Sequence, residues 1–203
     1  HFLCAQQRTC GEEIFDEGER FALAAPLNFV ASTMVLSYAL YRGCCTSHIL
    51  SFSTVKNPIA LIKYLLLKRI TLFFLTPTYA RKFAGKTGPF LKKMVVGSEP
   101  ANGYYLKGVT NYNMYAQSEG GVIAGMFVID KEYDVCPIGK PQFDMKYRVV
   151  DDDGNDVPDG EIGEFIFESP YVRGYINLPE ETKKAFRDGY FYTSDLARIF
   201  PDG

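Results

Sequence analysis

The sequence lacks an excess of charge of either sign. Its 203 residues include 22 lysines and arginines against 24 aspartates and glutamates, so the net charge at pH 7 is −2. A basic field that would attract nucleic acid or an anionic membrane surface is therefore missing. We expect no nucleic-acid partner.

Long hydrophobic runs are also missing. The most apolar stretch, residues 59–74, is interrupted by Lys63, Lys68 and Arg69. It is too short and too charged to cross a bilayer, so we expect no membrane span. The first residues do not have the layout of a secretory signal peptide.

Cysteine and histidine are scarce. The cysteines are Cys4, Cys10, Cys44, Cys45 and Cys136, and the histidines are His1 and His48. The odd number of cysteines without regular spacing does not indicate a disulfide framework, and the lack of a Cys-x-x-Cys pair argues against a zinc site built from such pairs. The adjacent Cys44 and Cys45 would bond to each other only with strain. We expect reduced thiols in a cytoplasmic protein.

The first part of the chain alternates short apolar runs with longer helical patterns. We expect strands at residues 21–25, 48–52, 71–75 and 93–96, and helices at 30–41 and 58–68. Asn57 and Pro58 have the residue types that begin a helix. Strands alternating with helices predict an α/β fold with a mostly parallel sheet flanked by helices.

The pattern changes at about residue 134. Short strands are expected at 145–150, 163–168 and 190–193, with one helix at 180–186. The acidic run at 151–156 lacks the spacing and the final glutamate of an EF-hand, so it is interpreted as a hairpin turn. We therefore divide one domain into an α/β portion, residues 1–134, and a small β-rich subdomain, residues 135–203.

Several short motifs occur in a fixed order along the second half of the chain. They are GSE at 97–99, NMYAQSE at 113–119, GEFI at 163–166, RGYIN at 173–177 and DGYFYTSDL at 188–196. In this order they resemble the AMP-binding domain of the adenylate-forming superfamily, which includes acyl- and aryl-CoA synthetases, peptide-synthetase adenylation domains and luciferases. The resemblance implies the N-terminal domain fold of that superfamily and the use of ATP, AMP and Mg²⁺.

The motif at 113–119 is implied to carry the catalytic residues. By resemblance, Tyr115 lies against the adenine, Ser118 donates its hydroxyl to the α-phosphate, and Glu119 binds Mg²⁺. These residue types suit those tasks, because a carboxylate is a hard ligand for a hard cation. Ala116 stands where the superfamily has glycine.

Two further motifs are implied to complete the nucleotide site. Gly97, Ser98 and Glu99 correspond to a loop on the other face of the adenine. Asp195 corresponds to the aspartate that accepts hydrogen bonds from the ribose hydroxyls. No catalytic role is assigned to the GEFI and RGYIN motifs, which are expected to organise the β-rich subdomain.

The acid-binding pocket is implied to include Asn28, Phe29 and Val30. Enzymes of the superfamily that activate α-amino acids usually place an aspartate in this region, and no carboxylate occurs between Phe21 and Tyr38. Because burying an ammonium group without a counter-charge is costly, the sequence favours an uncharged acyl or aryl acid.

The implied parent reaction joins a carboxylate to ATP, forming an acyl-AMP, and then transfers the acyl group to a thiol of CoA or of phosphopantetheine on a carrier protein. The phosphate loop of the superfamily and its C-terminal catalytic lysine have no counterpart here, and His1 matches the residue that commonly follows that loop. We therefore expect a fragment that alone turns over poorly. A peptide-synthetase adenylation domain and a degenerate, non-catalytic nucleotide-binding module remain as alternatives.

Overall fold

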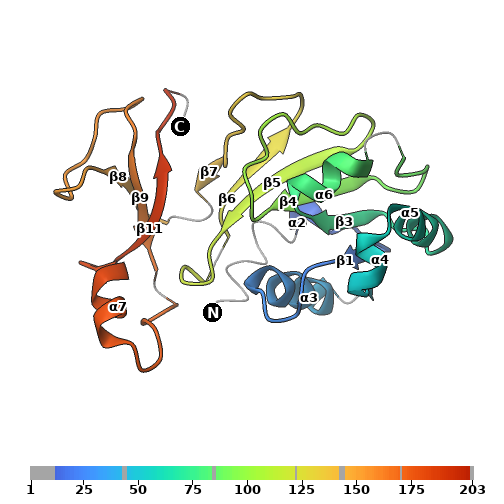
Figure 1. Ribbon diagram of the computed structural model, residues 1–203, viewed down its shortest axis with the longest axis horizontal. Helices are drawn as coiled ribbons and strands as arrows, with labels where there is room; N and C mark the ends of the chain where they lie inside the picture. Colours follow the sequence, from blue (N-terminus) through green and yellow to red (C-terminus); the bar gives the residue numbers. More distant parts are fainter. Residues whose placement is uncertain are drawn as a thin grey trace.

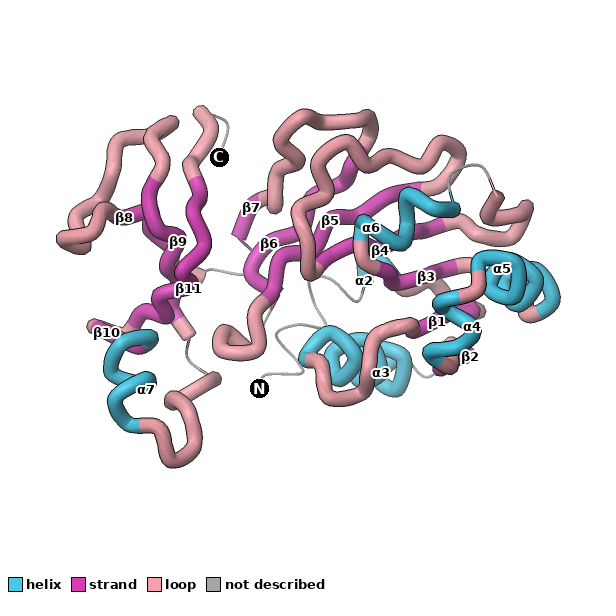
Figure 2. The backbone as a smooth tube through the Cα atoms, viewed as in Figure 1, coloured by secondary structure: helices cyan, strands magenta, loops and turns pink. Residues whose placement is uncertain are grey.

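Two β-sheets form the framework of the protein (Figure 1). The computed structural model describes residues 12–42, 45–83, 86–121, 123–141, 145–169 and 171–201. The predictions made for His1, Cys4, Cys10 and Cys44 lie outside the described residues. Figure 2 shows most of the helices beside the first sheet and one helix beside the second.

The elements have the following bounds. The helices are α2 (Glu12–Ile14), α3 (Val30–Arg42), α4 (Phe52–Lys56), α5 (Pro58–Leu67), α6 (Pro77–Ala80), the 3₁₀ turn η2 (Arg81–Phe83) and α7 (Pro179–Ala185). The strands are β1 (Arg20–Leu23), β2 (Thr46–Ile49), β3 (Leu72–Leu75), β4 (Lys93–Gly97), β5 (Thr110–Ala116), β6 (Ile123–Ile129), β7 (Lys140–Pro141), β8 (Tyr147–Val150), β9 (Gly163–Glu168), β10 (Phe186–Arg187) and β11 (Tyr190–Ala197).

The first sheet has seven strands in the order β2-β1-β3-β4-β5-β6-β7. Neighbouring strands from β2 to β5 run parallel. The last two pairs, β5–β6 and β6–β7, are antiparallel. The second sheet has four antiparallel strands in the order β10-β11-β9-β8. The predicted fold class, a mostly parallel sheet with helices followed by a small β-rich part, is confirmed.

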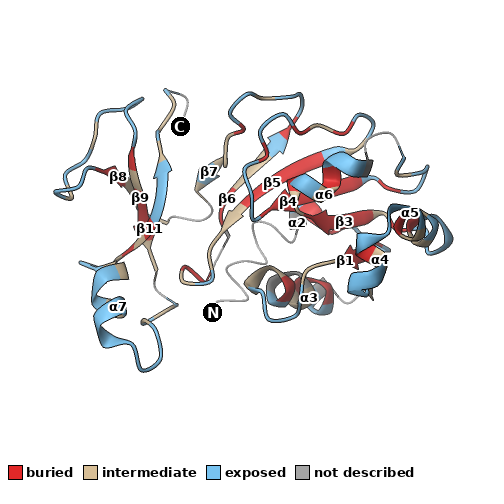
Figure 3. Ribbon diagram, in the orientation of Figure 1, coloured by how far each residue is buried: buried red, intermediate tan, exposed pale blue. Residues whose placement is uncertain are grey.

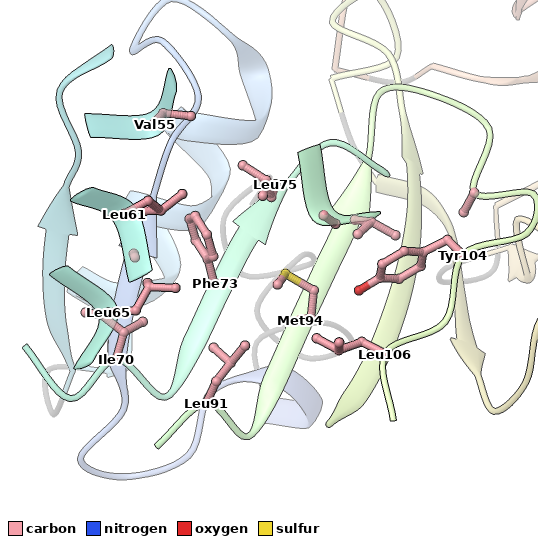
Figure 4. Packing of buried hydrophobic residues seen from close by; sticks show 14 of the residues in the cluster. Val55, Leu61, Leu65, Ile70, Phe73, Leu75, Leu91, Met94, Tyr104 and Leu106 are labelled. Atoms are coloured by element: carbon pink, nitrogen blue, oxygen red, sulfur yellow. The ribbon is translucent and has the colours of Figure 1, made fainter. Parts of the chain in front are cut away.

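Helices cover both faces of the parallel strands. Successive side chains in a strand point to opposite faces of the sheet, so apolar side chains on both faces need cover. In β3, Leu72 and Phe74 pack in one cluster with Tyr38 of α3. Phe73 and Leu75 pack in the other cluster with residues of α5. Figure 4 shows Leu61 and Leu65 of α5 pointing toward Phe73. Both faces of β3 are thus apolar, and Figure 3 shows β3 and β4 buried within the sheet.

Local signals in the sequence account for most of these elements. The Oδ1 atom of Asn57 accepts hydrogen bonds from the N–H groups of Ile59 and Ala60, each at 3.1 Å, which confirms the predicted cap. The strand predicted at 48–52 was placed too late, since β2 ends at Ile49 and Phe52 begins α4. The reason is Ser51, whose hydroxyl caps α4 by accepting from the N–H of Thr54 at 3.3 Å.

The second sheet has an aromatic core of its own. Phe165, Phe167 and Phe191 are buried in one cluster with Val149. The predicted hairpin turn at 151–156 is confirmed, because Asp151 Oδ1 accepts from the N–H groups of Asp153 at 3.0 Å and of Asn155 at 2.8 Å. β7 (Lys140–Pro141) lies after residue 134 and still belongs to the first sheet, and the second sheet begins with β8. The division of the domain at residues 134 and 135 stays a prediction.

Two expectations concern the protein's surroundings. Within the described ranges, the helices are all too short or too polar to span a membrane.

Cys136 carries a free thiol that is buried against Asn113 and Pro137. Burial raises the pKa of this thiol to about 11, so it stays protonated at neutral pH.

Candidate functional site

The motif residues of the first sheet meet at one edge. β4 and β5 are adjacent and parallel, with Gly97 and Met114 paired in register at their carboxyl ends. A Cβ atom on Gly97 would lie 2.7 Å from the carbonyl oxygen of Met114, so only glycine fits there without a shift of backbone. Open α/β sheets bind ligands outside the carboxyl ends of their strands. The segments that begin at Gly97 and Tyr115 are therefore side by side at such an edge.

Glu99 is held by the helix next to it. Its Oε2 atom accepts a hydrogen bond from the N–H of Thr78 in α6 at 3.1 Å and a second one from the Thr78 hydroxyl. The hydroxyl bond is the main reason that the pKa of Glu99 is below its usual value. Ser98, before it, has a φ of +70°, which turns the chain sharply after β4. Glu99 thus fixes this turn against α6.

Tyr115 and Asp195 join the two sheets. The Tyr115 hydroxyl donates to Asp195 Oδ2 at 2.6 Å. The side-chain amide of Gln117 donates to the same carboxylate oxygen and, at 3.1 Å, to the Tyr115 hydroxyl. Burial, followed by the bond to Asp195, raises the pKa of Tyr115, so the phenol remains neutral and can donate. A tyrosine, an amide and a carboxylate from two sheets therefore form one network.

An irregularity in β11 aims Asp195 at this network. The pairing register with β9 shifts between Tyr192 and Leu196, and Ser194 has a φ of +60°. The N–H of Ser194 donates to Glu164 Oε1 at 2.9 Å, and the N–H of Asp195 donates to Thr193 Oγ1 at 3.0 Å. Such irregularities redirect side chains. Ser194 therefore adopts the left-handed conformation that glycine tolerates best.

Ser118 and Glu119 lie in the turn between β5 and β6, which projects toward the second sheet in Figure 1. The carbonyl oxygen of Gln117 accepts from the N–H groups of Gly120 at 3.1 Å and Gly121 at 3.3 Å. Ser118 is exposed, and Glu119 is half-buried. Glu119 Oε1 accepts from the hydroxyl of Tyr175 at 3.2 Å.

A pocket of about 310 Å³ opens beside this turn. Its lining includes Gln117, Glu119, Glu164, Tyr175, Thr193 and Ser194. In the part of the chain that the structure describes, no group of three or more acidic, histidine or cysteine side chains could hold a metal ion. Mg²⁺ in nucleotide sites usually takes only one or two carboxylates, with phosphate and water oxygens as its other ligands. Glu119 therefore suits an ion that arrives with a nucleotide.

The residues predicted for the acid pocket lie farther along the same edge. Asn28 and Phe29 are exposed in the loop between β1 and α3, and Val30 begins α3. The hydroxyl of buried Ser32 holds this loop by donating to the carbonyl oxygens of Ala25 and Pro26 at 3.2 and 2.8 Å. β1 is three strand steps from β5, a distance of about 14 Å. The structure thus brings Tyr115 and Asp195 into contact and places residues 28–30 apart from them.

Sequence reasoning assigned no role to Gln117, Glu164 or Tyr175. Gln117 lies within the 113–119 motif, two residues after Tyr115 and directly after the end of β5, so its position in the motif was a signal that could have identified it. For Glu164 and Tyr175 the sequence carries no comparable signal, since their partners are 30 and 56 residues away.

Comparison with known proteins supplies the family context. The sequence model of a family described as AMP-binding enzyme matches residues 1–176. Bacitracin synthase 1 of Bacillus licheniformis is 29% identical over 99% of this chain and 4% of its own length. Feruloyl-CoA synthase of an Amycolatopsis species is 29% identical over 91% of the chain and 40% of its own length. The chain thus spans less than half of either relative.

Solved structures share the fold. The nonribosomal peptide synthetase FmoA3 superposes with a TM-score of 0.87 at 21% identity, over 100% of this chain and 24% of that one. O-succinylbenzoate CoA synthetase of Bacillus subtilis, in complex with ATP and a magnesium ion, superposes with a TM-score of 0.79 at 17% identity, over 99% of this chain and 43% of that one.

Proposed function

We propose that this chain, which belongs to the AMP-binding enzyme family, is part of a ligase that activates a carboxylic acid with ATP. The observation that carries this proposal is the contact between Tyr115 and Asp195 beside the turn that holds Ser118 and Glu119. An aromatic ring can pack against adenine, and a hydroxyl can donate to a phosphate oxygen. One carboxylate can bind the metal, and the other can accept hydrogen bonds from the ribose hydroxyls.

Each residue then has a task in nucleotide binding. Tyr115 offers its ring to the adenine, with Ala116 next to it and Gly97, Ser98 and Glu99 on the neighbouring strand end. Asp195 accepts hydrogen bonds from the ribose hydroxyls, and Ser118 donates to the α-phosphate. Glu119 binds Mg²⁺, which neutralises charge on the phosphates. A related fold holds ATP and a magnesium ion, which supports this assignment.

The proposed reaction has two steps. A carboxylate oxygen of the acid attacks the α-phosphorus of ATP, the bond from that phosphorus to the bridging oxygen breaks, and pyrophosphate leaves. A thiol then attacks the acyl carbon of the acyl-AMP, giving a thioester and AMP. The residues of this chain contribute by positioning the nucleotide and by electrostatic stabilisation. The thiol belongs to CoA or to phosphopantetheine on a carrier protein.

We propose an uncharged acyl or aryl acid as the substrate, bound near Asn28, Phe29 and Val30. The lack of a carboxylate between Phe21 and Tyr38 supports this choice, as does the similarity to feruloyl-CoA synthase. The second candidate is a peptide-synthetase adenylation domain, which the similarity to bacitracin synthase 1 over 99% of the chain favours. In either case we place the protein in the cytoplasm, where ATP is abundant.

Calorimetric titration of the chain with AMP, and with ATP plus Mg²⁺, tests the proposal. We expect saturable binding that Asp195→Ala weakens by at least tenfold, since removal of a charged hydrogen-bond partner costs about 1.5–3 kcal/mol. Asp188→Ala, a change of the same type in the turn before β11, serves as the control. An Asp195→Ala variant that binds nucleotide with wild-type affinity would overturn the assignment of the ribose site.

A further inference from the structure

The RGYIN motif contacts the proposed metal ligand. Tyr175, its central residue, lies 56 positions after Glu119 in the sequence, and its hydroxyl donates to Glu119 Oε1 at 3.2 Å. Both side chains line the pocket beside the β5–β6 turn. The motif was expected only to organise the β-rich part, so this contact gives it a second task.

The loop around Tyr175 is built to fix its position. The N–H of Tyr175 donates to Thr182 Oγ1 at 2.8 Å, and that hydroxyl donates to the carbonyl oxygen of Leu178 at 2.9 Å. Gly174 has a φ of +138°, and a Cβ atom there would lie 2.2 Å from Thr182 Cγ2. The Tyr175 ring packs edge-on against Phe186, with 6.1 Å between ring centroids. Thr182 and Phe186 therefore determine where the phenol points.

The backbone of Glu119 is held from the same side. The hydroxyl of Ser169, directly after β9, lies within hydrogen-bond distance of the carbonyl oxygens of Glu119 at 3.2 Å and Gly120 at 3.4 Å. Among the residues that the structure describes, Glu119 Oε2 accepts no hydrogen bond, so one carboxylate oxygen is held and the other is available. Ser169 thus holds the main chain of Glu119, and Tyr175 holds its side chain.

We propose that Tyr175 is a positioning residue for Mg²⁺ binding: it holds Glu119 Oε1 so that Oε2 is oriented for an ion carried by the nucleotide. This inference rests on the proposed function of Glu119. Hydrogen-bond partners of metal ligands set the orientation of those ligands, and their loss typically lowers metal affinity about 10- to 100-fold. Glu119 is only half-buried, so the lower end of that range is expected.

The test is Tyr175→Phe in the 203-residue chain, which removes the hydroxyl and keeps the ring against Phe186. ATP binding is measured by calorimetry at increasing MgCl₂ concentrations, and AMP binding is measured without Mg²⁺. We expect the Mg²⁺ concentration for half-maximal ATP binding to rise about tenfold, while AMP affinity without Mg²⁺ and the melting temperature stay within error.

Tyr133→Phe is the matched control, since it also removes a hydroxyl that donates to a carboxylate, in this case Asp130 Oδ1 at 2.7 Å. A double variant with Glu119→Gln should show no further effect of Tyr175→Phe on the Mg²⁺ requirement. Unchanged Mg²⁺ dependence in Tyr175→Phe, or an equal loss of AMP binding without Mg²⁺, would overturn the proposal and leave the proposed function intact. Wild-type protein that binds neither nucleotide would overturn both.

Discussion

The hydroxyl of Tyr115 donates to the carboxylate of Asp195 at 2.6 Å across two sheets, although the residues are 80 positions apart in the chain. Gln117 donates to the same oxygen. The two residues proposed to bind adenine and ribose are thus already connected by a hydrogen bond.

Removal of that hydroxyl should weaken nucleotide binding. Tyr115→Phe keeps the ring but leaves Asp195 with one fewer donor, and a hydrogen bond to a charged group contributes about 1.5–3 kcal/mol. We expect AMP affinity, measured by calorimetry, to fall about tenfold. The control is Tyr133→Phe, which should leave AMP affinity unchanged. Wild-type affinity in Tyr115→Phe would show that the hydroxyl does not help to position Asp195.

Gly97→Ala should damage both the sheet and the site. The added Cβ would lie 2.7 Å from the carbonyl oxygen of Met114, and both groups belong to paired strands. Because backbone cannot move as freely as a side chain, we expect a loss of about 1–3 kcal/mol in the free energy of unfolding. Urea denaturation measures it, and AMP titration should show weaker binding. Full stability would mean that β4 and β5 can separate at this edge without cost.

Stability in acid should depend on the contact between Thr78 and Glu99. The hydroxyl bond from Thr78 lowers the folded-state pKa of Glu99 below its reference value of 4.5. A lowered carboxylate pKa contributes stability above the unfolded value, and this contribution is lost as the pH falls through the folded value. Thr78→Val should therefore melt at a lower temperature than wild type at pH 7, and the difference should shrink below about pH 4.5. A difference that stays constant from pH 7 to pH 3 would contradict this explanation.

Phe73→Ala should strongly destabilise the first sheet. Phe73 is fully buried in the cluster between β3 and α5, and such a truncation costs about 3–5 kcal/mol. The matched control is Phe52→Ala at the start of α4, where the ring is 68% exposed, and its cost should stay within about 0.5 kcal/mol. Urea denaturation of both variants checks the contrast. Similar losses for the two would mean that the face of α4 is covered in solution.

Much of the first sheet could be predicted because its signals are local. Residues 21–23 of β1, 72–75 of β3 and 94–96 of β4 are continuously apolar, as is typical of strands with both faces buried. α5 begins at Pro58, and the side chain of Asn57 caps it by accepting hydrogen bonds from the N–H groups of Ile59 and Ala60. The antiparallel strands β5, β6 and β7 were not predicted, because apolar and polar residues do not alternate strictly in the segments that pair.

The types of the site residues are determined by the sequence, and their arrangement is determined by the fold. Motifs at 97–99, 113–119 and 188–196 identified residues whose chemistry suits a nucleotide. The contacts of Asp195 with Tyr115 and of Tyr175 with Glu119 exist only because the second sheet lies beside the β5–β6 turn. Composition and short-range pattern determine which groups are present and which segments form strands. Distances between residues more than 50 positions apart depend on how the strands pair and pack, and only the tertiary structure decides those.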